Sequence, residues 1–257
     1  MNSTNKNFHL LMDLLSIKQT FPLTLMNGNT INCKQLTTSQ LKQLIKTIVD
    51  SPLTQATFTS TATKIFEESV EQDTTSSHLN IIDRLLFILE TRIHTISQEI
   101  VVNTDTSTYT LNITTIINNL RNNIIEYIPL FQDKTFQKGN VTLTIGIPLL
   151  TAEFQLNEEL YNDFDPNVND SDELRKAIGD VFINEIAKTI KTIKVDDVEL
   201  DLAEVTFKDR LDAIEKLPAS LIQNVIEYAE AYKTIISQSL TISGYSLPVD
   251  GSLFSLN

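Results

Sequence analysis

The spacing of apolar residues switches repeatedly between the helical and the strand period, and this switching constrains the fold more than any other feature. Within residues 81–93 apolar side chains recur three and four positions apart, from Ile82 to Ile93, which predicts a buried amphipathic helix. Over 99–113 apolar and polar residues alternate around a polar NTDTS tip, which predicts an extended hairpin. Interleaved patterns of both kinds predict the α+β class.

The rest of the amino-terminal half follows the same rules. Phe21, Leu23 and Leu25 alternate before Asn27-Gly28, and this order predicts a hairpin closed by a type I′ turn. The other elements predicted here are helices over 38–48, 58–70, 116–128 and 152–161 and a strand over 141–147. We expect Ser51-Pro52 and Pro129 to end two of the helices. The predicted fold is mostly helical with several short antiparallel hairpins.

The carboxy-terminal third carries stronger helix signals. Asp170 and Glu173 fit a capping box ahead of an apolar stripe that runs from Leu174 to Ile190. A tight turn between two short strands follows near 195–200, then a helix begins after the looser cap formed by Thr206 and Asp209. Pro218 opens a long helix that continues to Ile236, and residues 240–254 indicate short strands joined by turns.

These signals predict three regions in the chain. Residues 1–162 form an amino-terminal α+β region with a central β-hairpin. Residues 163–173 are rich in acids with few apolar side chains and are predicted to be a linker. Residues 174–257 are predicted to form a carboxy-terminal helical module that docks onto other proteins. No fixed-period repeat divides the chain further.

Charge and cysteine content exclude several classes of partner. The chain holds 20 Lys and Arg against 33 Asp and Glu, a formal net charge of -13, which would repel a nucleic acid or an anionic lipid surface. Such acidity is typical of solubility or of docking onto a basic protein face, and charge alone does not decide between them. Cys33 is the only cysteine, so no intrachain disulfide can form and a reducing compartment fits best. No secretory signal and no apolar run of bilayer length are found, so we expect no membrane partner and a cytosolic chain.

Motifs for catalysis are not found. Six scattered glycines offer neither GxGxxG nor GxxxxGK[ST], so the common phosphate-binding loops are missing. His9, His78 and His94 lie in different segments and form no HExxH, and Cys33 and the serines lack a GxSxG context. Adjacent acids such as Glu158-Glu159 are expected by chance in so acidic a chain. We therefore expect a protein without catalytic residues or cofactor.

The acidic linker matches a calcium-binding loop only in part. Asp163, Asp165 and Asn167 match the first, third and fifth ligand positions of such a loop. The sixth position needs glycine for a sharp turn and holds Val168, and the twelfth needs a bidentate Glu and holds Leu174. The prediction is a solvated linker without a metal.

Several carboxy-terminal motifs resemble one known family. They are a helix followed by a short hairpin at 193–202, then Phe207-Lys208-Asp209-Arg210, then Lys216-Leu217-Pro218-Ala219 ahead of a long helix, and a closing Asp250-Gly251-Ser252-Leu253-Phe254. This order resembles the baseplate hub subunit and hub-assembly family of T-even-type contractile-tailed phages. The segment PLTLMNGNTINCKQLTTSQLKQLIK is similar to the same family more faintly. Some members carry a CxxC pair in the central hairpin, but 99–113 has no cysteine, so no zinc role follows.

The resemblance implies a non-enzymatic component of a contractile phage tail, a hub subunit or a hub-assembly factor. It implies other baseplate hub and tape-measure or tail-tube proteins as partners, and a location in the virion tail baseplate or in the host cytoplasm during assembly. It leaves open whether the chain stays in the virion and whether it forms a homo-oligomer. The alternative is a cytosolic helical adaptor or assembly chaperone unrelated to a virion, using the amphipathic helices of 207–236. Aromatic and Arg side chains dominate interface energies, so the predicted contact residues are Phe207, Arg210, Tyr228, Tyr232 and Phe254.

Overall fold

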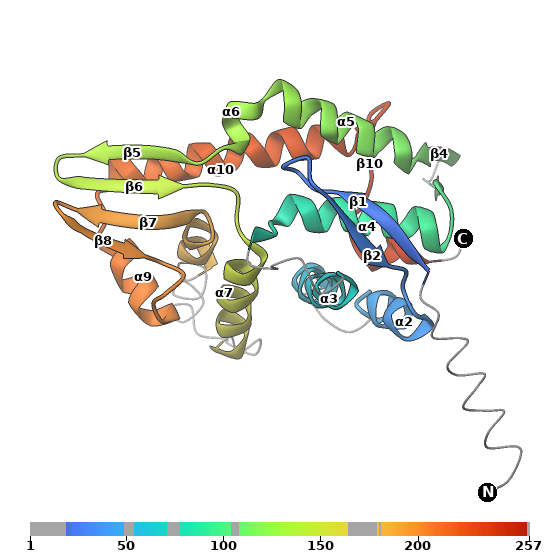
Figure 1. The fold of residues 1–257 in the computed structure, drawn as a ribbon, viewed down its shortest axis with the longest axis horizontal. Coiled ribbons are helices and arrows are strands. Elements are labelled where there is room, and N and C mark those ends of the chain that lie inside the picture. The colour runs from blue at the N-terminus through green and yellow to red at the C-terminus, as the bar shows by residue number, and fades with distance from the viewer. Residues whose placement is uncertain are drawn as a thin grey trace, which may run out of the picture.

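The computed structural model describes residues 19–48, 54–70, 78–103, 108–163, 179 and 181–255. Helices and short antiparallel sheets alternate along the chain, so the predicted α+β class is confirmed (Figure 1). In chain order the elements are β1 (Thr20–Thr24), β2 (Thr30–Lys34), α2 (Thr38–Lys46), α3 (Thr54–Ser69), α4 (Ile81–Thr95), β3 (Glu99–Asn103), β4 (Thr108–Asn112), α5 (Ile113–Glu126), α6 (Ile128–Phe131), β5 (Lys134–Lys138), β6 (Val141–Ile145), α7 (Leu150–Asp163), β7 (Ile190–Val195), β8 (Val198–Asp201), α9 (Phe207–Glu215), α10 (Ala219–Ser239), β9 (Thr241–Ile242), β10 (Tyr245–Ser246) and the 3₁₀ turn η2 (Gly251–Phe254).

Helix α4 lies at the centre of the helical part and is buried around most of its circumference, as its wide apolar stripe predicted. Asn80 starts the helix with a capping box in which Asn80 accepts from the backbone of Asp83 and the Asp83 carboxylate accepts from the backbone of Asn80. The Phe87 ring stacks on Phe66 of α3 at 4.5 Å and on Phe21 of β1 at 6.3 Å. Truncating a buried Phe of this kind to Ala typically costs about 3–5 kcal/mol, so this stack holds α4 between β1 and α3.

Strands β5, β6, β7 and β8 form one antiparallel sheet in that order. Leu143 of β6 lies opposite Phe136 of β5 and Ile193 of β7, and Leu143 and Ile193 are buried. Helix α10 contacts β5 with one part of its length and α5 with another, so this single helix joins the sheet to the helical part (Figure 1).

The predicted hairpins are confirmed, with one correction in turn geometry. β1 pairs with β2 as expected, and Leu23 and Cys33 from the two strands are fully buried. The turn is not type I′: Gly28 N donates to Leu25 O (3.0 Å) and Leu25 N donates to Asn29 O (2.7 Å). This is the bonding of a three-residue loop in which Gly28, at φ 87°, takes the left-handed position. A type I′ turn would also need Asn27 at positive φ, and it does not have one.

The helix predictions differ from the structure mainly at their ends. The long helix after Pro218 is confirmed as α10. Pro129 does not simply stop a helix, because it lies in the first turn of α6. Ile190, predicted on a helical face, begins β7, and the end of the chain forms the 3₁₀ turn η2 rather than a strand. The predicted stop at Ser51-Pro52 and residues 164–173 of the predicted linker lie outside the described residues.

The predicted carboxy-terminal module does not form a separate core. β6, before the predicted linker, pairs along its length with β7, after it, from Val141↔Val195 to Ile145↔Ile190. At the chain end, η2 packs on α2, and Leu253 O accepts a hydrogen bond from Arg92 Nε of α4 (2.7 Å). The described elements on both sides of residues 163–173 therefore share one sheet and one core. None of the described helices combines the length and apolar character needed to cross a bilayer.

Candidate interaction surface

Most of the predicted contact residues are buried in the protein core. Tyr228 and Tyr232 of α10 are 4% and 2% exposed, with their rings edge to face at 5.5 Å, and burial raises the pKa of both hydroxyls. Phe254 of η2 is fully buried. Arg210 is 3% exposed and donates to the backbone oxygen of Leu202. These side chains therefore stabilise this fold, and only half-buried Phe207 is partly open to a partner.

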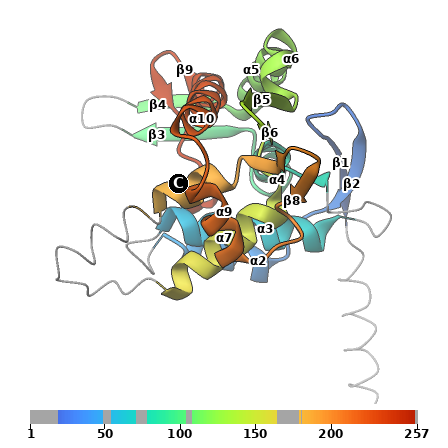
Figure 2. The same cartoon turned by 90° about the vertical axis from the view of Figure 1, so that its left-hand side faces the viewer.

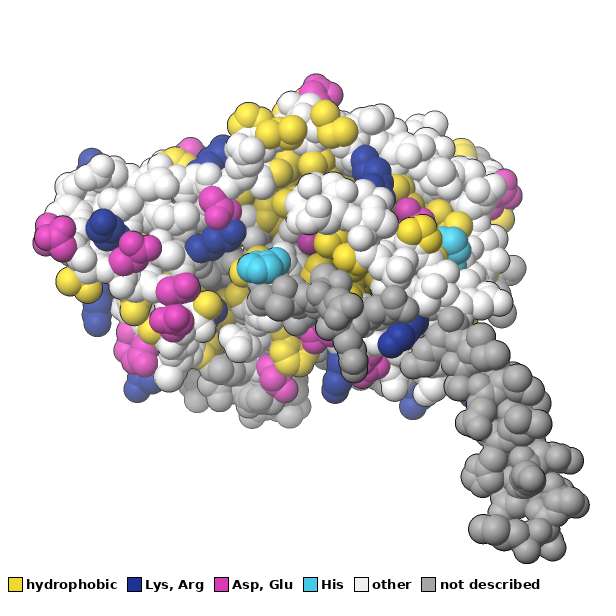
Figure 3. All heavy atoms as spheres, viewed as in Figure 1, with side chains coloured by type: hydrophobic (Ala, Val, Ile, Leu, Met, Phe, Trp, Pro, Cys, Tyr) yellow, Lys and Arg dark blue, Asp and Glu magenta, His cyan; other side chains and the backbone are white. Residues whose placement is uncertain are grey.

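A different surface is exposed where α5 meets α6, and we call it the α5–α6 corner: Ile125, Tyr127, Ile128 and Pro129. Ile125 is 66% exposed, Ile128 45% and Tyr127 41%, and Pro129 is also exposed. In the space-filling view apolar side chains gather at the top of the molecule, over the place where Figure 1 labels α6 (Figure 3). Contiguous exposed apolar groups of this kind are typical of protein interaction sites.

The chain geometry explains why these residues face outward. Ile116, Leu120 and Ile124 lie on the buried face of α5, and Ile125, about 100° around the helix from Ile124 in its last turn, is 66% exposed. Tyr127 ends α5 with φ -108° and ψ 30°, and its N–H donates to Asn123 O (2.9 Å). Leu130 N donates to Tyr127 O (2.8 Å), which starts α6 at once in a new direction. The corner is therefore fixed by backbone hydrogen bonds.

The electrostatic character of the corner comes from Glu126. A hydrogen bond to Glu126, together with the negative charge of Glu126, raises the pKa of Tyr127 above its ordinary value. The Tyr127 hydroxyl donates its one proton to Glu126, and its oxygen remains an acceptor for a partner. One acid among apolar and aromatic groups is a common composition for an interface.

The predicted contact residues do not include this corner, although the sequence carries a signal for it. Ile124 continues the apolar stripe of Ile116 and Leu120, and Ile125 is a further apolar residue beside that stripe at the end of the helix. The Tyr-Ile-Pro-Leu order that follows predicts a helix stop at Pro129. Adjacent apolar residues at a helix end, followed by an aromatic and a proline, were the available indication.

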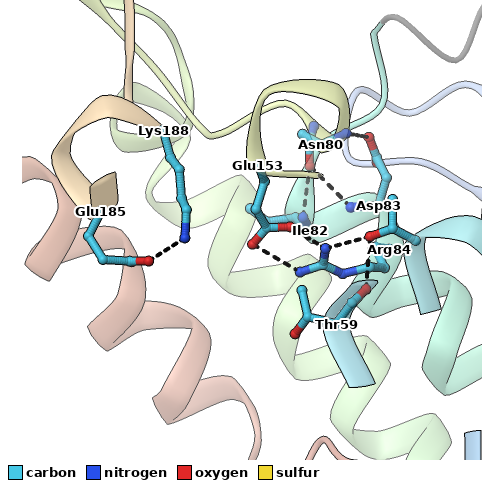
Figure 4. Close-up of polar contacts among 9 residues, drawn as sticks. Thr59, Asn80, Ile82, Asp83, Arg84, Glu153, Glu185 and Lys188 are labelled. Atoms are coloured by element: carbon cyan, nitrogen blue, oxygen red, sulfur yellow. Dashed lines mark hydrogen bonds and ion pairs between the residues drawn. The ribbon is translucent and has the colours of Figure 1, made fainter. Parts of the chain in front are cut away.

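The buried polar groups nearest the centre connect helices. Arg84 of α4 donates to Thr63 Oγ1 of α3 (2.8 Å) and pairs with the Glu153 carboxylate of α7 (Figure 4). Both members of the ion pair are nearly buried, so each satisfies the other in a region of low dielectric. Arg84 therefore joins α4 to α7 through the ion pair and to α3 through the hydrogen bond to Thr63.

Asp83 and Glu185 are the other carboxylates in Figure 4. Burial raises the pKa of Asp83, while hydrogen bonds from Met26 N (2.7 Å) and Asn80 N (3.1 Å) act in the opposite direction. Burial also acts to raise the pKa of Glu185, but the ion pairs with Lys188 and Lys233 outweigh it and hold that pKa below its ordinary value. Asp83 is therefore held by backbone donors and Glu185 by two lysines.

A hollow of about 780 Å³ lies between α2, α3 and α7. Its lining is rich in hydroxyl and amide side chains, and its charged members Lys46, Lys64, Glu68 and Glu158 are all exposed. In the part of the chain that the structure describes, no group of three or more His, Cys, Asp or Glu could hold a metal ion. Most of the calcium-like positions lie outside that part.

Comparison of the chain with protein-family models, with curated proteins and with solved structures finds no match. The functional interpretation therefore depends on the residues and on the geometry described above.

Proposed function

We propose that this chain is a non-enzymatic component of a contractile phage tail, a baseplate hub subunit or hub-assembly factor that acts through protein–protein contacts. The observation that carries the contact role is the α5–α6 corner, with Ile125, Tyr127 and Ile128 exposed together on a rigid helix junction. Burying exposed apolar surface contributes about 25 cal/mol per Å². A partner that covers this corner therefore gains binding free energy from its apolar side chains.

The resemblance to phage hub proteins supports the tail assignment. Its motif residues determine local structure in this chain. Phe207 begins α9, Pro218 precedes the first residue of α10, and Asp250 caps η2 by accepting from Ser252 N (2.7 Å). The likeness therefore concerns the residues that shape the carboxy-terminal third, and it supports a shared fold there.

The proposed partners are other hub proteins and tape-measure or tail-tube proteins, met in the host cytoplasm during assembly or in the finished baseplate. The alternative of an adaptor using the helices of 207–236 has less free surface, because α10 already packs against α5, α6 and β5. The corner, in contrast, is open in the described structure.

The proposal is tested with the paired substitution Ile125→Ser and Ile128→Ser, introduced together into the phage genome. Asn122→Ala is the matched control, because Asn122 is an exposed polar residue of the same helix. We expect the paired variant to lower the yield of assembled baseplates, measured by sedimentation of tail intermediates, and the control to leave it unchanged. Normal assembly by the paired variant would remove the corner from the account, and intact tails after deletion of the whole chain would refute the tail role.

A further inference from the structure

β8 is an edge strand of the four-stranded sheet. The hydrogen bond from Leu202 N to Lys191 O (2.9 Å) continues the β7–β8 register. It makes Lys191 and Leu202 a hydrogen-bonded pair, so Lys194 and Glu199, three positions along the ladder, are a non-bonded pair. Bonded and non-bonded pairs alternate in an antiparallel ladder, so the N–H and C=O of Glu199 point away from β7. Within the described chain no backbone group bonds to them. An edge of this kind can accept an added strand.

The tip of this hairpin is both apolar and firmly held. Val198 is 74% exposed and Val195 is 40% exposed, and the two lie opposite each other. Asp196 N donates to Asn140 O (3.0 Å), and the Asp196 carboxylate accepts from Asn140 Nδ2 (3.0 Å), so the tip is tied to the β5–β6 turn. A preformed edge loses little conformational entropy when a partner strand binds.

The surroundings of this edge are strongly acidic. Residues 196–215 contain eight carboxylates against Lys208 and Arg210, and exposed Lys194 of β7 lies opposite Glu199, so the carboxylates exceed these three cations by five. All eight carboxylates are exposed: Asp196, Asp197, Glu199, Asp201, Glu204, Asp209, Asp212 and Glu215. They lie on β8, on α9 and on the loops beside them, which are neighbours in both ribbon views (Figures 1 and 2). Acidic side chains are prominent at that end of the molecule (Figure 3).

We propose that the β8 edge binds an extended, lysine- or arginine-rich segment of a partner protein as an added strand. The outward N–H and C=O of Glu199 supply the backbone bonds, and Val195 and Val198 supply apolar contact for one face of that segment. The carboxylates complement basic side chains that alternate along it, which gives selectivity for charge. This proposal adds the chemistry of a partner to the proposed function. It rests on one part of that function, that the chain acts through protein–protein contacts.

Charge also selects against other occupants of the edge. Two copies of β8 pairing with each other would place Glu199 and Asp201 of one copy near those of the other, and like charges across a strand pair are destabilising. A nucleic acid or an anionic lipid surface would be repelled in the same way. A basic protein segment is the occupant that satisfies both the open edge and the acidic rim.

The test uses the purified full chain and a labelled peptide of about ten residues that alternates lysine with valine, followed by fluorescence anisotropy. A second peptide has the same sequence but carries a backbone N-methyl group on every residue, so it keeps its charge and neither of its edges can pair as a strand. A third peptide replaces lysine with glutamate. Titrations at about 50 mM and about 200 mM salt separate screened charge contacts from strand pairing.

We expect the lysine peptide to bind, with weaker binding at higher salt, and the N-methylated and glutamate peptides to bind at least about tenfold more weakly. Glu199→Pro in the protein should reproduce the loss, and Glu199→Gln should retain most of the binding because the backbone edge is intact. Equal binding of the lysine and N-methylated peptides would overturn the strand-pairing proposal, as would no binding of the lysine peptide. The α5–α6 corner is unchanged in these experiments, so their failure would not bear on the proposed function.

Discussion

Gly251 lies where the carboxy-terminal turn η2 meets α2. The substitution Gly251→Ala tests how η2 packs on α2. Gly251 is buried. A Cβ added there would lie 2.6 Å from the backbone oxygen of Leu44, 2.7 Å from Ile48 Cγ1 and 2.9 Å from Thr47 Oγ1. All three distances are below the 3.0 Å that real Cβ contacts essentially never cross. Gly251→Ala must therefore move η2 away from α2.

The size of the effect follows from the nature of the closest atom. Leu44 O is a backbone atom that already accepts from Thr47 Oγ1 at 2.6 Å, so it cannot rotate away as a flexible side chain would. Overpacking of this kind costs about 1–3 kcal/mol. With a urea m-value of about 2–3 kcal/mol per M, a loss of about 2 kcal/mol lowers the unfolding midpoint by about 0.7–1 M. The corresponding fall in Tm is about 4–8 °C.

Equilibrium urea unfolding measures this change, with Gly179→Ala as the control. Gly179 is exposed and helical, and a Cβ there would meet nothing within 4 Å, so the control should be neutral or slightly stabilising. We expect one transition for both variants, because the chain end and α2 belong to one core. Equal midpoints for the two variants would refute the packing of η2 on α2. A separate early transition in Gly251→Ala would instead favour an independent carboxy-terminal module.

Three further substitutions test other parts of the structure. Burial raises the pKa of Asp83, so its contribution is fully present below the unfolded pKa of about 3.9 and is lost as pH rises through the folded value. The Asp83→Asn variant does not titrate at this position, so we expect its free energy of unfolding to come closer to that of the wild type as pH rises above about 4. Unfolding titrations over this pH range measure the difference. Arg92→Met removes donors to Leu253 O and Ser97 O (2.7 Å each) and should cost about 1–3 kcal/mol by the same assay, with Arg92→Lys recovering only part. Ile125→Ser, at a 66% exposed site, should change stability by less than about 0.5 kcal/mol, and a larger loss would mean that the α5–α6 corner is part of the core.

Local patterns in the sequence predicted local structure well. The stripe from Ile82 to Ile93 identified α4, and alternation around the Asn-Gly turn, the NTDTS tip and the Asp-Asp turn identified three hairpins, because each depends on residues close together in the chain. The pairing of β6 with β7 was not predicted. Those strands are separated by α7 and the acidic stretch, and alternation within a strand does not say which strand is its neighbour.

The candidate surface was harder to predict for a related reason. Tyr228 and Tyr232 have the composition of interface anchors, but the same aromatic residues fill cores, and only the position of α10 against β5 and α5 shows which role they take. The exposure of Val198 depends on β8 being an edge strand, which follows from the strand order and not from the residue itself. Surfaces are thus determined by long-range packing that a single sequence does not reveal.

The central claim is that this chain works as a protein-binding component of a contractile tail, and a mass-spectrometric inventory of purified particles and tail intermediates tests it most directly. We predict that peptides of this chain occur at a fixed ratio to the other hub proteins, either in the finished particle or in a hub intermediate that precedes it. The absence of this chain from both the particles and every tail intermediate would contradict the account.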